Sequence, residues 1–512
     1  MITAGTADAS LVQSVDWLTI APPTLTALVA LGVLVADLFV PAGRKHLLGW
    51  IAVTGLAAAL ALLLPLRSGD RSTFCLTAAA QTDSHAQTAG CSYTADHFTL
   101  VIQLLVLGGA LLTALLSLPA TRAGKLPAGE YWFLLLSSAA GAALLPASRD
   151  LATLVVALEV ASLPAFALVG LKRGDRRSSE AALKFFLSSV TATAVTLLGV
   201  SFVYAATGTL HLTEIAARLD DVPGRLQTLA EAGVALTLVG FAFKVAAVPF
   251  HFWVPDTYSG APLPVAAYLS VVGKAVGFTG LILVTVVAFP AYADIWGPAL
   301  AVLAALTMTA GNVAALRQDP TRAGSAIRLL AWSSVAQAGY LLVPIAAAAY
   351  SSDDQIGATV AYALMYAVVN LGAFAVVALV ARTHPGKRIS DHAGLHATSP
   401  AAALALAFFL LNLAGLPPGI IGLFAKVTVF SSAVDAGLGW LAVVMGVNVV
   451  IGLAYYLRWT ALLFRTPEDA VRPEPRRAPA PVTAAIALTA VAGAVLSGYP
   501  QLALRYATAG LF

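Results

Sequence analysis

The chain has little charge, because only 11% of its 512 residues are Asp, Glu, Lys or Arg, whereas 59% are hydrophobic. Soluble domains carry roughly a quarter charged residues, so this composition excludes an ordinary soluble domain. Apolar runs of about 20 residues, each long enough to cross about 30 Å of hydrocarbon, recur along nearly the whole sequence. The composition therefore predicts an integral membrane protein whose core is the bundle inside the bilayer.

Cysteine is almost absent, and the sequence patterns that hold cofactors are absent as well. The two cysteines, Cys75 and Cys91, lie in a polar segment and have no metal-binding spacing with histidines. The sequence contains no Gly-rich nucleotide loop and no haem-attachment motif. We therefore expect no cofactor and no metal in this chain, and we expect no nucleic-acid partner.

The apolar runs predict an all-α membrane protein with about fourteen membrane-spanning helices. The N-terminal stretch lacks a basic region and carries Asp8 and Asp16, unlike a cleaved signal peptide, so we expect the first span to be retained. The predicted spans are 18–40, 47–66, 97–118, 129–147, 151–171, 180–206, 229–256, 262–289, 293–316, 325–349, 356–382, 400–434, 437–464 and 480–498.

Basic residues occupy every second connection between these spans. The positive-inside rule places such connections in the cytoplasm, so both chain termini are expected outside, in agreement with an even number of spans. The alternate connections are poor in Lys and Arg and contain Asp294, Asp353, Asp354 and Asp435. The basic connections contain Arg44 and Lys45; Arg122 and Lys125; Lys172, Arg173, Arg176 and Arg177; Arg317 and Arg322; Arg382, Lys387 and Arg388; and Arg465, Arg472, Arg476 and Arg477.

This topology also places the polar segment 67–96, with both cysteines, outside the cytoplasm. An oxidising compartment permits a disulfide, which would stabilise the chain by about 3 kcal/mol in the chain-entropy model. We predict a disulfide between Cys75 and Cys91, with two unpaired thiols as the alternative.

Three lysines and one glutamate lie within the apolar runs of predicted spans, away from the connections: Lys244, Lys274, Lys426 and Glu159. An ionised group at the bilayer centre costs about 2.5 to 3.5 kcal/mol, so each needs a partner, a water-filled cavity or a function. A lysine in water has a pKa of about 10.4, burial lowers the pKa of a lysine, and a nearby carboxylate raises it. A glutamate that moves or changes its charge could therefore make a lysine hold or release a proton. The alternatives are a structural ion pair of Glu159 with Lys244 and static roles for the other two lysines.

The seventh and twelfth predicted spans are long and carry helix breakers next to a lysine. Pro249 follows Lys244, and the run Gly415 to Gly419, with two prolines, precedes Lys426. A proline removes a helix hydrogen bond and leaves carbonyls that only protein or water can satisfy within the membrane. The two interrupted spans are five spans apart, which predicts two inverted five-helix repeats, spans 4–8 and 9–13. The expected division is 1–128 for an N-terminal three-helix region with the outer loop 67–96, 129–289 and 290–464 for the repeats, and 465–512 for a cytoplasmic loop and the last helix.

Two further candidates have open interpretations. Lys184 lies near the cytoplasmic end of span 6, where it could relay protons or extend to the interface. His251 follows Pro249 and could gate entry or hydrogen-bond free carbonyls.

The residues around the first break resemble a known family. The stretch from Phe243 to Pro262, FKVAAVPFHFWVPDTYSGAP, followed by Lys274, resembles the signature of the antiporter-like membrane subunits of respiratory complex I. Its Tyr258-Ser-Gly-Ala-Pro262 ending resembles the N type rather than the L or M type. Three further stretches agree, and the resemblance covers roughly residues 95 to 465: Leu158-Glu159 with Pro164; Arg328 to Tyr340, RLLAWSSVAQAGY; and Leu416-Pro417-Pro418 with Phe424 and Lys426.

The resemblance implies a non-redox, proton-translocating subunit of a bacterial NADH:quinone oxidoreductase in the inner or plasma membrane. It implies a relay in which Glu159 and Lys244 are linked through Lys274 to Lys426, with Gln337 and Tyr340 as further relay or gating candidates. Many members have a histidine where this chain has Gln337. Since glutamine does not titrate near neutral pH, proton transfer at that position would use water.

The resemblance also implies partners. These are an M-type antiporter-like subunit, small K-type and J-type membrane subunits and the lipid bilayer, with NADH, FMN, iron–sulfur clusters and quinone bound by partner subunits. Two alternatives remain: a subunit of a multi-protein Na⁺/H⁺ antiporter, against which the Tyr258 to Pro262 ending argues, and a purely structural scaffold subunit.

Overall fold

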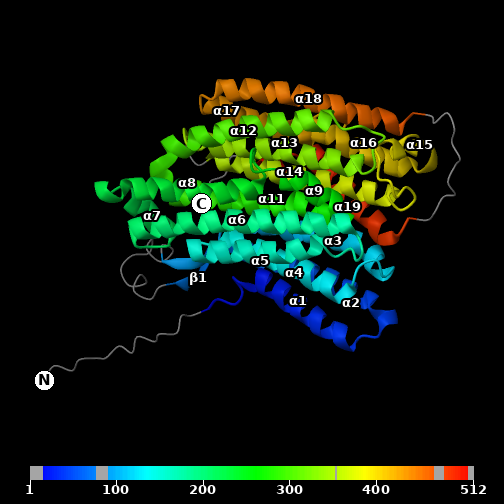
Figure 1. Cartoon of the computed structure of the whole chain (residues 1–512), viewed down its shortest axis with the longest axis horizontal. Coiled ribbons are helices and arrows are strands. Elements are labelled where there is room, and N and C mark those ends of the chain that lie inside the picture. The colour runs from blue at the N-terminus through cyan, green and yellow to red at the C-terminus, as the bar shows by residue number, and fades with distance from the viewer. Residues whose placement is uncertain (1–14, 76–89, 352–353, 466–477, 506–512) are drawn as a thin grey trace.

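The structure is a computed structural model that describes residues 15–75, 90–351, 354–465 and 478–505. Long helices run side by side, with α1 and α2 at one edge and α17 and α18 at the opposite edge (Figure 1). Asp8, Asp353, Arg472, Arg476, Arg477 and both chain termini, all used in the topology prediction, lie outside the described residues. The long uninterrupted helices are α1 (Ala21–Phe39), α2 (His46–Ala61), α3 (His97–Arg122), α4 (Ala128–Leu144), α5 (Leu151–Val169), α6 (Arg176–Thr207), α12 (Ala293–Leu316), α13 (Ser325–Ala347), α14 (Asp354–Val380), α18 (Gly439–Leu463) and α19 (Ala480–Gly498).

The number of spans agrees with the prediction. Among the described residues, 13 helical stretches are long and apolar enough to cross a membrane. A further span is interrupted and consists of two shorter helices, α16 (Pro400–Ala414) and α17 (Ile420–Asp435). The prediction of an all-helical membrane bundle is therefore confirmed, whereas the inverted relation of its two repeats stays a prediction.

Both predicted interruptions are present. Helix α8 (Gln227–Val245) is followed by Ala246, which adopts a left-handed conformation with φ of 68°, and then by α9 (Trp253–Gly260). Helix α16 ends at Ala414 and is followed by Gly415, whose φ is 87°. A residue with a side chain is strained at such a φ, and a Cβ on Gly415 would lie 3.2 Å from Cδ of Lys426. We call residues 246–252 the first break and residues 415–419 the second break.

The span after the first break is an irregular helix. It consists of α10 (Leu263–Tyr268), the π-helical turn η6 (Leu269–Gly273), α11 (Lys274–Ile282) and a second π-helical turn, η7 (Leu283–Ala288). π-turns often occur at functional sites. Lys274 follows η6 directly, and Gly277 permits close approach, because a Cβ there would lie 2.6 Å from the backbone nitrogen of Val245. The π-turn and the glycine together place Lys274 against the end of α8.

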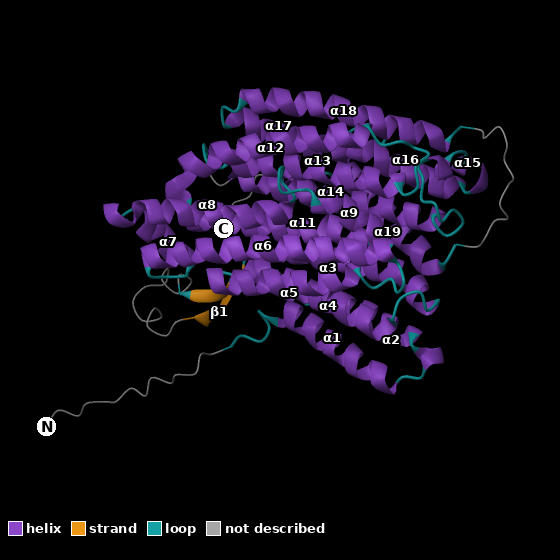
Figure 2. Ribbon diagram, in the orientation of Figure 1, coloured by secondary structure: helices purple, strands orange, loops and turns teal. Residues whose placement is uncertain are grey.

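The two ends of the bundle differ. At one end, β1 (Arg71–Cys75) and β2 (Cys91–Ala95) pair antiparallel, and a disulfide joins Cys75 to Cys91 (Figure 2). At the other end the basic connections meet: the Gly324 nitrogen donates to the Gly386 carbonyl at 2.8 Å, and the Gly394 nitrogen donates to the Leu462 carbonyl at 3.2 Å. The shorter helices are η1 (Ala42–Arg44), η2 (Pro65–Ser68), η4 (Leu145–Ala147), α7 (Leu212–Leu219), η5 (Gly224–Leu226), η8 (Pro290–Tyr292), η9 (Ser390–His392), α15 (Leu395–Thr398) and α20 (Gln501–Leu504).

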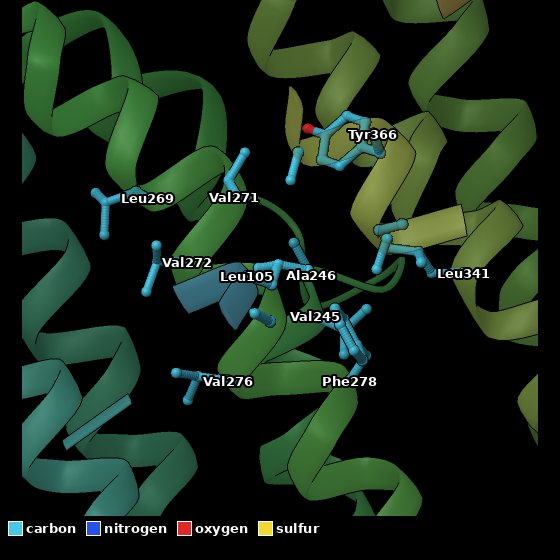
Figure 3. Packing of buried hydrophobic residues seen from close by; sticks show 14 of the residues in the cluster. Leu105, Val245, Ala246, Leu269, Val271, Val272, Val276, Phe278, Leu341 and Tyr366 are labelled. Carbon is cyan, nitrogen blue, oxygen red and sulfur yellow. The ribbon is translucent and has the colours of Figure 1, made fainter. Parts of the chain in front are cut away.

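Apolar packing surrounds the first break. Figure 3 shows Val245 and Ala246 together with Val272 and Val276 of the following span, all members of one buried cluster. The cluster also contains Tyr366 of α14. Buried apolar contacts therefore connect the break to the second half of the bundle.

Candidate functional site

Lys244 is buried near the C-terminal end of α8, with 6% of its surface exposed. Its Nζ donates to the hydroxyl of Ser162 on α5 and to the hydroxyl of Ser189 on α6, both at 2.7 Å. The ammonium also lies 5.5 Å from the centroid of the Phe166 ring, within the range of a cation–π interaction. Neutral groups alone therefore contact this ammonium directly.

Glu159 lies half-buried on α5, close to this site but not in contact with Lys244. The Thr193 hydroxyl of α6 donates to Glu159 Oε1 at 2.7 Å. Within the described part of the chain, no ion pair joins Glu159 to Lys244. Ser162 is about one helical turn after Glu159, and Ser189 about one turn before Thr193. Hydroxyl groups of α5 and α6 thus contact the carboxylate and the ammonium separately, about one helical turn apart.

A cavity of about 30 Å³ adjoins Lys244 and is lined by Ser138, Ser162 and Tyr268, among others. A water molecule needs at least about 10 to 15 Å³, so the cavity has room for one or two. The Tyr268 hydroxyl donates to the Ser138 hydroxyl at 2.9 Å. Water and hydroxyl groups can therefore extend the polar contacts of Lys244 toward α10.

Lys274 is buried at the first break, with 3% of its surface exposed. Its Nζ donates to the carbonyl of Val245 at 3.0 Å, at the last residue of α8. The last carbonyls of a helix lack partners within the helix and attract cations. Lys274 thus binds the residue that directly follows Lys244, at the broken end of α8.

Polar side chains continue from the Lys274 region into the second half. Asn370 Nδ2 of α14 donates to the Ser270 hydroxyl at 2.7 Å, and Ser270 lies in η6, about one turn before Lys274. The Tyr366 hydroxyl donates to the Ser270 carbonyl at 3.2 Å and is also hydrogen-bonded to the Ser334 hydroxyl of α13 at 2.9 Å. These groups lead from the eighth span to α13.

Gln337 lies in a buried network that joins α13, α14 and α18. Its Nε2 donates to the Tyr456 hydroxyl at 3.3 Å, and its Oε1 accepts a hydrogen bond from the Tyr362 hydroxyl. The Tyr456 hydroxyl also contacts the Ser333 hydroxyl at 2.5 Å. A cavity of about 20 Å³, with room for one water, is lined by Gln337, Tyr362 and Lys426, among others. Gln337 is therefore next to Lys426.

Lys426 is buried at the second break, with 8% of its surface exposed. Its Nζ donates to the carbonyls of Leu413 at 2.9 Å and of Ala414 at 2.6 Å, at the C-terminal end of α16. The Tyr340 ring lies below the ammonium, with 5.7 Å from Nζ to the ring centroid. Lys426 thus binds the end of the broken helix in its own span.

The structure places the two remaining candidates, Lys184 and His251, apart from Glu159 and the three buried lysines. Lys184 is half exposed and forms ion pairs with Glu180 at 2.8 Å and with Asp256 at 3.0 Å. His251 lies in the first break, half-buried, with its ring 5.4 Å from the Trp332 ring. Neither residue contacts Glu159 or the three buried lysines through a hydrogen bond or ion pair of the described residues.

Lys172 is a further lysine at a broken helix end, and the sequence analysis did not single it out for this role. Its Nζ donates to the carbonyls of Gly260 at 3.1 Å and Ala261 at 2.9 Å, at the end of α9. Burial lowers the pKa of Lys172 to about 8, and the nearby charge of Lys387 acts in the same direction. The C-terminal ends of α8, α9 and α16 therefore each bind a lysine. An available signal was the position of Lys172 directly after span 5.

The donor set does not suggest a metal centre. Over the described ranges, no group of three or more His, Cys, Asp or Glu residues could hold a metal ion.

Three comparisons relate the chain to known proteins. Residues 148–452 match the family described as "NADH:quinone oxidoreductase/Mrp antiporter, TM". A protein of Streptomyces griseus named NADH-quinone oxidoreductase subunit N 2 is 78% identical, over 98% of this chain and 95% of its own length. A chain of respiratory complex I from Thermus thermophilus, solved with bound aureothin, superposes with a TM-score of 0.74 and 31% identity, over 94% of this chain and 98% of that chain. A chain of the Mrp complex from Dietzia has a TM-score of 0.81 at 22% identity, covers 96% of both chains, and shows the shared fold alone.

Proposed function

We propose that this chain carries protons across the membrane. It belongs to the family of NADH:quinone oxidoreductase and Mrp antiporter membrane subunits, and within that family to the N subunits of NADH-quinone oxidoreductase. In this proposal Glu159, Lys244, Lys274 and Lys426 are the relay, and water in the two small cavities completes it. The chain itself is non-redox, and electron transfer to quinone in partner subunits drives the transfer of protons.

One observation carries the proposal: the three buried lysines bind neutral oxygens only. Hydroxyls hold Lys244, one carbonyl holds Lys274, and two carbonyls hold Lys426. A buried charge with a purely structural role is normally paired with an opposite charge. Because no ion pair of the described residues involves these lysines, none has to break when a lysine gains or loses a proton. This favours a relay over a scaffold.

The surface around Glu159 supports a partner subunit at this face. Val156, Val160 and Leu163 of α5 are exposed, and Glu159 is only half-buried among them. A carboxylate against lipid tails is costly. We therefore place another antiporter-like membrane subunit of M type, or a small K-type or J-type subunit, on this face of α5. NADH, FMN, iron–sulfur clusters and quinone belong to other subunits of the assembly.

The proposed orientation follows from charge. The protein lies in the bacterial plasma membrane with its basic connections in the cytoplasm and with both termini and the disulfide hairpin outside. The two breaks support a division into repeats at 129–289 and 290–464, since α8–α9 falls in one and α16–α17 in the other. The flanking regions are 1–128 and 465–512.

The proposal is tested with Lys244→Ala in the assembled complex, reconstituted into vesicles. NADH-driven acidification should fall by roughly a hundredfold, at the low end for loss of a positioned acid–base group. Glu159→Gln keeps an oxygen that can accept from Thr193 but removes the charge, so pumping should fall less. The control is Lys125→Ala, because Lys125 is exposed in a basic connection.

Gel analysis of the intact complex must show the subunit in every variant. Normal proton transfer by an assembled Lys244→Ala complex would remove Lys244 from the relay.

A further inference from the structure

A third, larger cavity lies at the basic end of α12, α13 and α18, away from Lys244, Lys274 and Lys426. Its volume is about 370 Å³, within the range of about 300 to 1,000 Å³ for small-molecule pockets. Leu316 of α12, Leu329 of α13 and Leu462 of α18 give it a mainly apolar wall. Helix α12 ends at Leu316 and α18 at Leu463. The cavity therefore lies where these spans end, at the depth of the lipid headgroups.

Two arginines line this cavity, and the described residues offer neither of them an acidic partner. Arg458 and Arg465 are exposed side chains of the α18 end, and no carboxylate of the described residues lies within ion-pair distance of them. Arginine binds phosphate oxygens through two parallel hydrogen bonds. The cavity thus combines an apolar wall with positive charge that the described residues leave unbalanced.

We propose that this cavity binds the phosphate-bearing headgroup of an anionic phospholipid. Phosphate oxygens accept hydrogen bonds from Arg458 and Arg465, and the acyl chains leave along the leucine wall toward the bilayer. Basic pockets between transmembrane helices on the cytoplasmic side have this preference for acidic headgroups. The cavity volume suits a headgroup with its glycerol and leaves the chains in the membrane.

The test uses the intact complex in vesicles that contain phosphatidylglycerol or phosphatidylcholine with a photoreactive group near the glycerol. After irradiation, peptide mapping by mass spectrometry should find labelled phosphatidylglycerol on residues 455–465. The double substitution Arg458→Gln with Arg465→Gln should lower this labelling roughly 30-fold, which corresponds to about 1 kcal/mol per basic residue. Arg382→Gln is the matched control, because Arg382 is an exposed arginine in a basic connection and does not line the cavity.

Three outcomes would overturn the proposal. Equal labelling by the two lipids would mean that the headgroup charge is not recognised. Loss of labelling in 10 mM inorganic phosphate, without loss in 10 mM chloride, would assign the arginines to a soluble anion. A several-fold gain in Glu468→Gln with Asp469→Asn would show that acidic residues of the following segment occupy the arginines. Three results together support the lipid site: stronger labelling by phosphatidylglycerol than by phosphatidylcholine, labelling unchanged by inorganic phosphate and by Glu468→Gln with Asp469→Asn, and loss of labelling in the double arginine variant but not in Arg382→Gln.

Discussion

The two broken spans hold their lysines in different ways. At the first break two lysines make different contacts: Lys244 of the broken span binds hydroxyls, and Lys274 of the next span binds the free carbonyl of Val245. At the second break Lys426 binds the carbonyls of Leu413 and Ala414 in its own span. Glu159 lies near Lys244, whereas the cavity beside Lys426 is lined by neutral groups such as Gln337 and Tyr362.

The contacts of Lys244 can therefore rearrange, whereas those of Lys426 stabilise the fold. Hydroxyl groups can rotate and can both donate and accept, so the contacts of Lys244 can rearrange at little cost. A backbone carbonyl can only accept, and within the membrane it needs a donor. We therefore expect Lys426 to contribute more to the stability of the fold than Lys244, although both belong to the proposed relay.

The largest expected loss of stability is that of Lys426→Met, for which Lys244→Met is the comparison. The methionine keeps the length of the side chain but removes the donor. Lys426→Met leaves two buried carbonyls unsatisfied, at about 1 to 3 kcal/mol each, and should clearly lower the temperature at which the subunit leaves the detergent-solubilised complex. Lys244→Met should lower it much less, because the Ser162 hydroxyl still donates to the Leu158 carbonyl at 2.6 Å. Equal losses of stability would contradict the distinction.

Lys274→Met should give an intermediate result. It leaves one carbonyl, that of Val245, without this donor, at a cost of about 1 to 3 kcal/mol. The dissociation temperature should therefore fall between those of the other two variants, while proton pumping is lost as in Lys244→Ala. A dissociation temperature as high as that of the unsubstituted complex would mean that another group satisfies the end of α8.

The smallest effect is expected for the hydroxyls around Lys244. Ser162→Ala and Ser189→Ala each remove one hydrogen bond, worth about 0.5 to 1.5 kcal/mol, and should slow proton pumping a few-fold without loss of assembly. Ser188→Ala is the matched control, because the Ser188 hydroxyl donates to the Lys184 carbonyl and does not contact Lys244. If Ser188→Ala slows pumping as much as Ser189→Ala, the hydroxyls have no specific role.

The spans and both breaks could be predicted because apolar runs and prolines act locally along the sequence. The pairing of Lys184 with Glu180 also has a local signal, since the residues are four apart on one helix. The contacts of Lys274 with Val245 and of Lys184 with Asp256 had no such signal, because they depend on how separate spans pack. Ser162 lies three residues after Glu159, which was a usable signal, but a serine in a helix commonly binds its own backbone and so looks unremarkable.

The amide group of Gln337 sets which of its neighbours donate and which accept hydrogen bonds. Tyr362 donates to the amide oxygen and the amide nitrogen donates to Tyr456, whose hydroxyl also contacts that of Ser333. A hydroxyl can reverse its role by rotating, but an amide has its donor and its acceptor on different atoms. Reversing this series therefore requires Gln337 to turn its amide group by half a turn. Gln337 thus gives the polar interior beside Lys426 a fixed electrical polarity, running from α14 through α13 to α18, which a change of protonation alone does not erase.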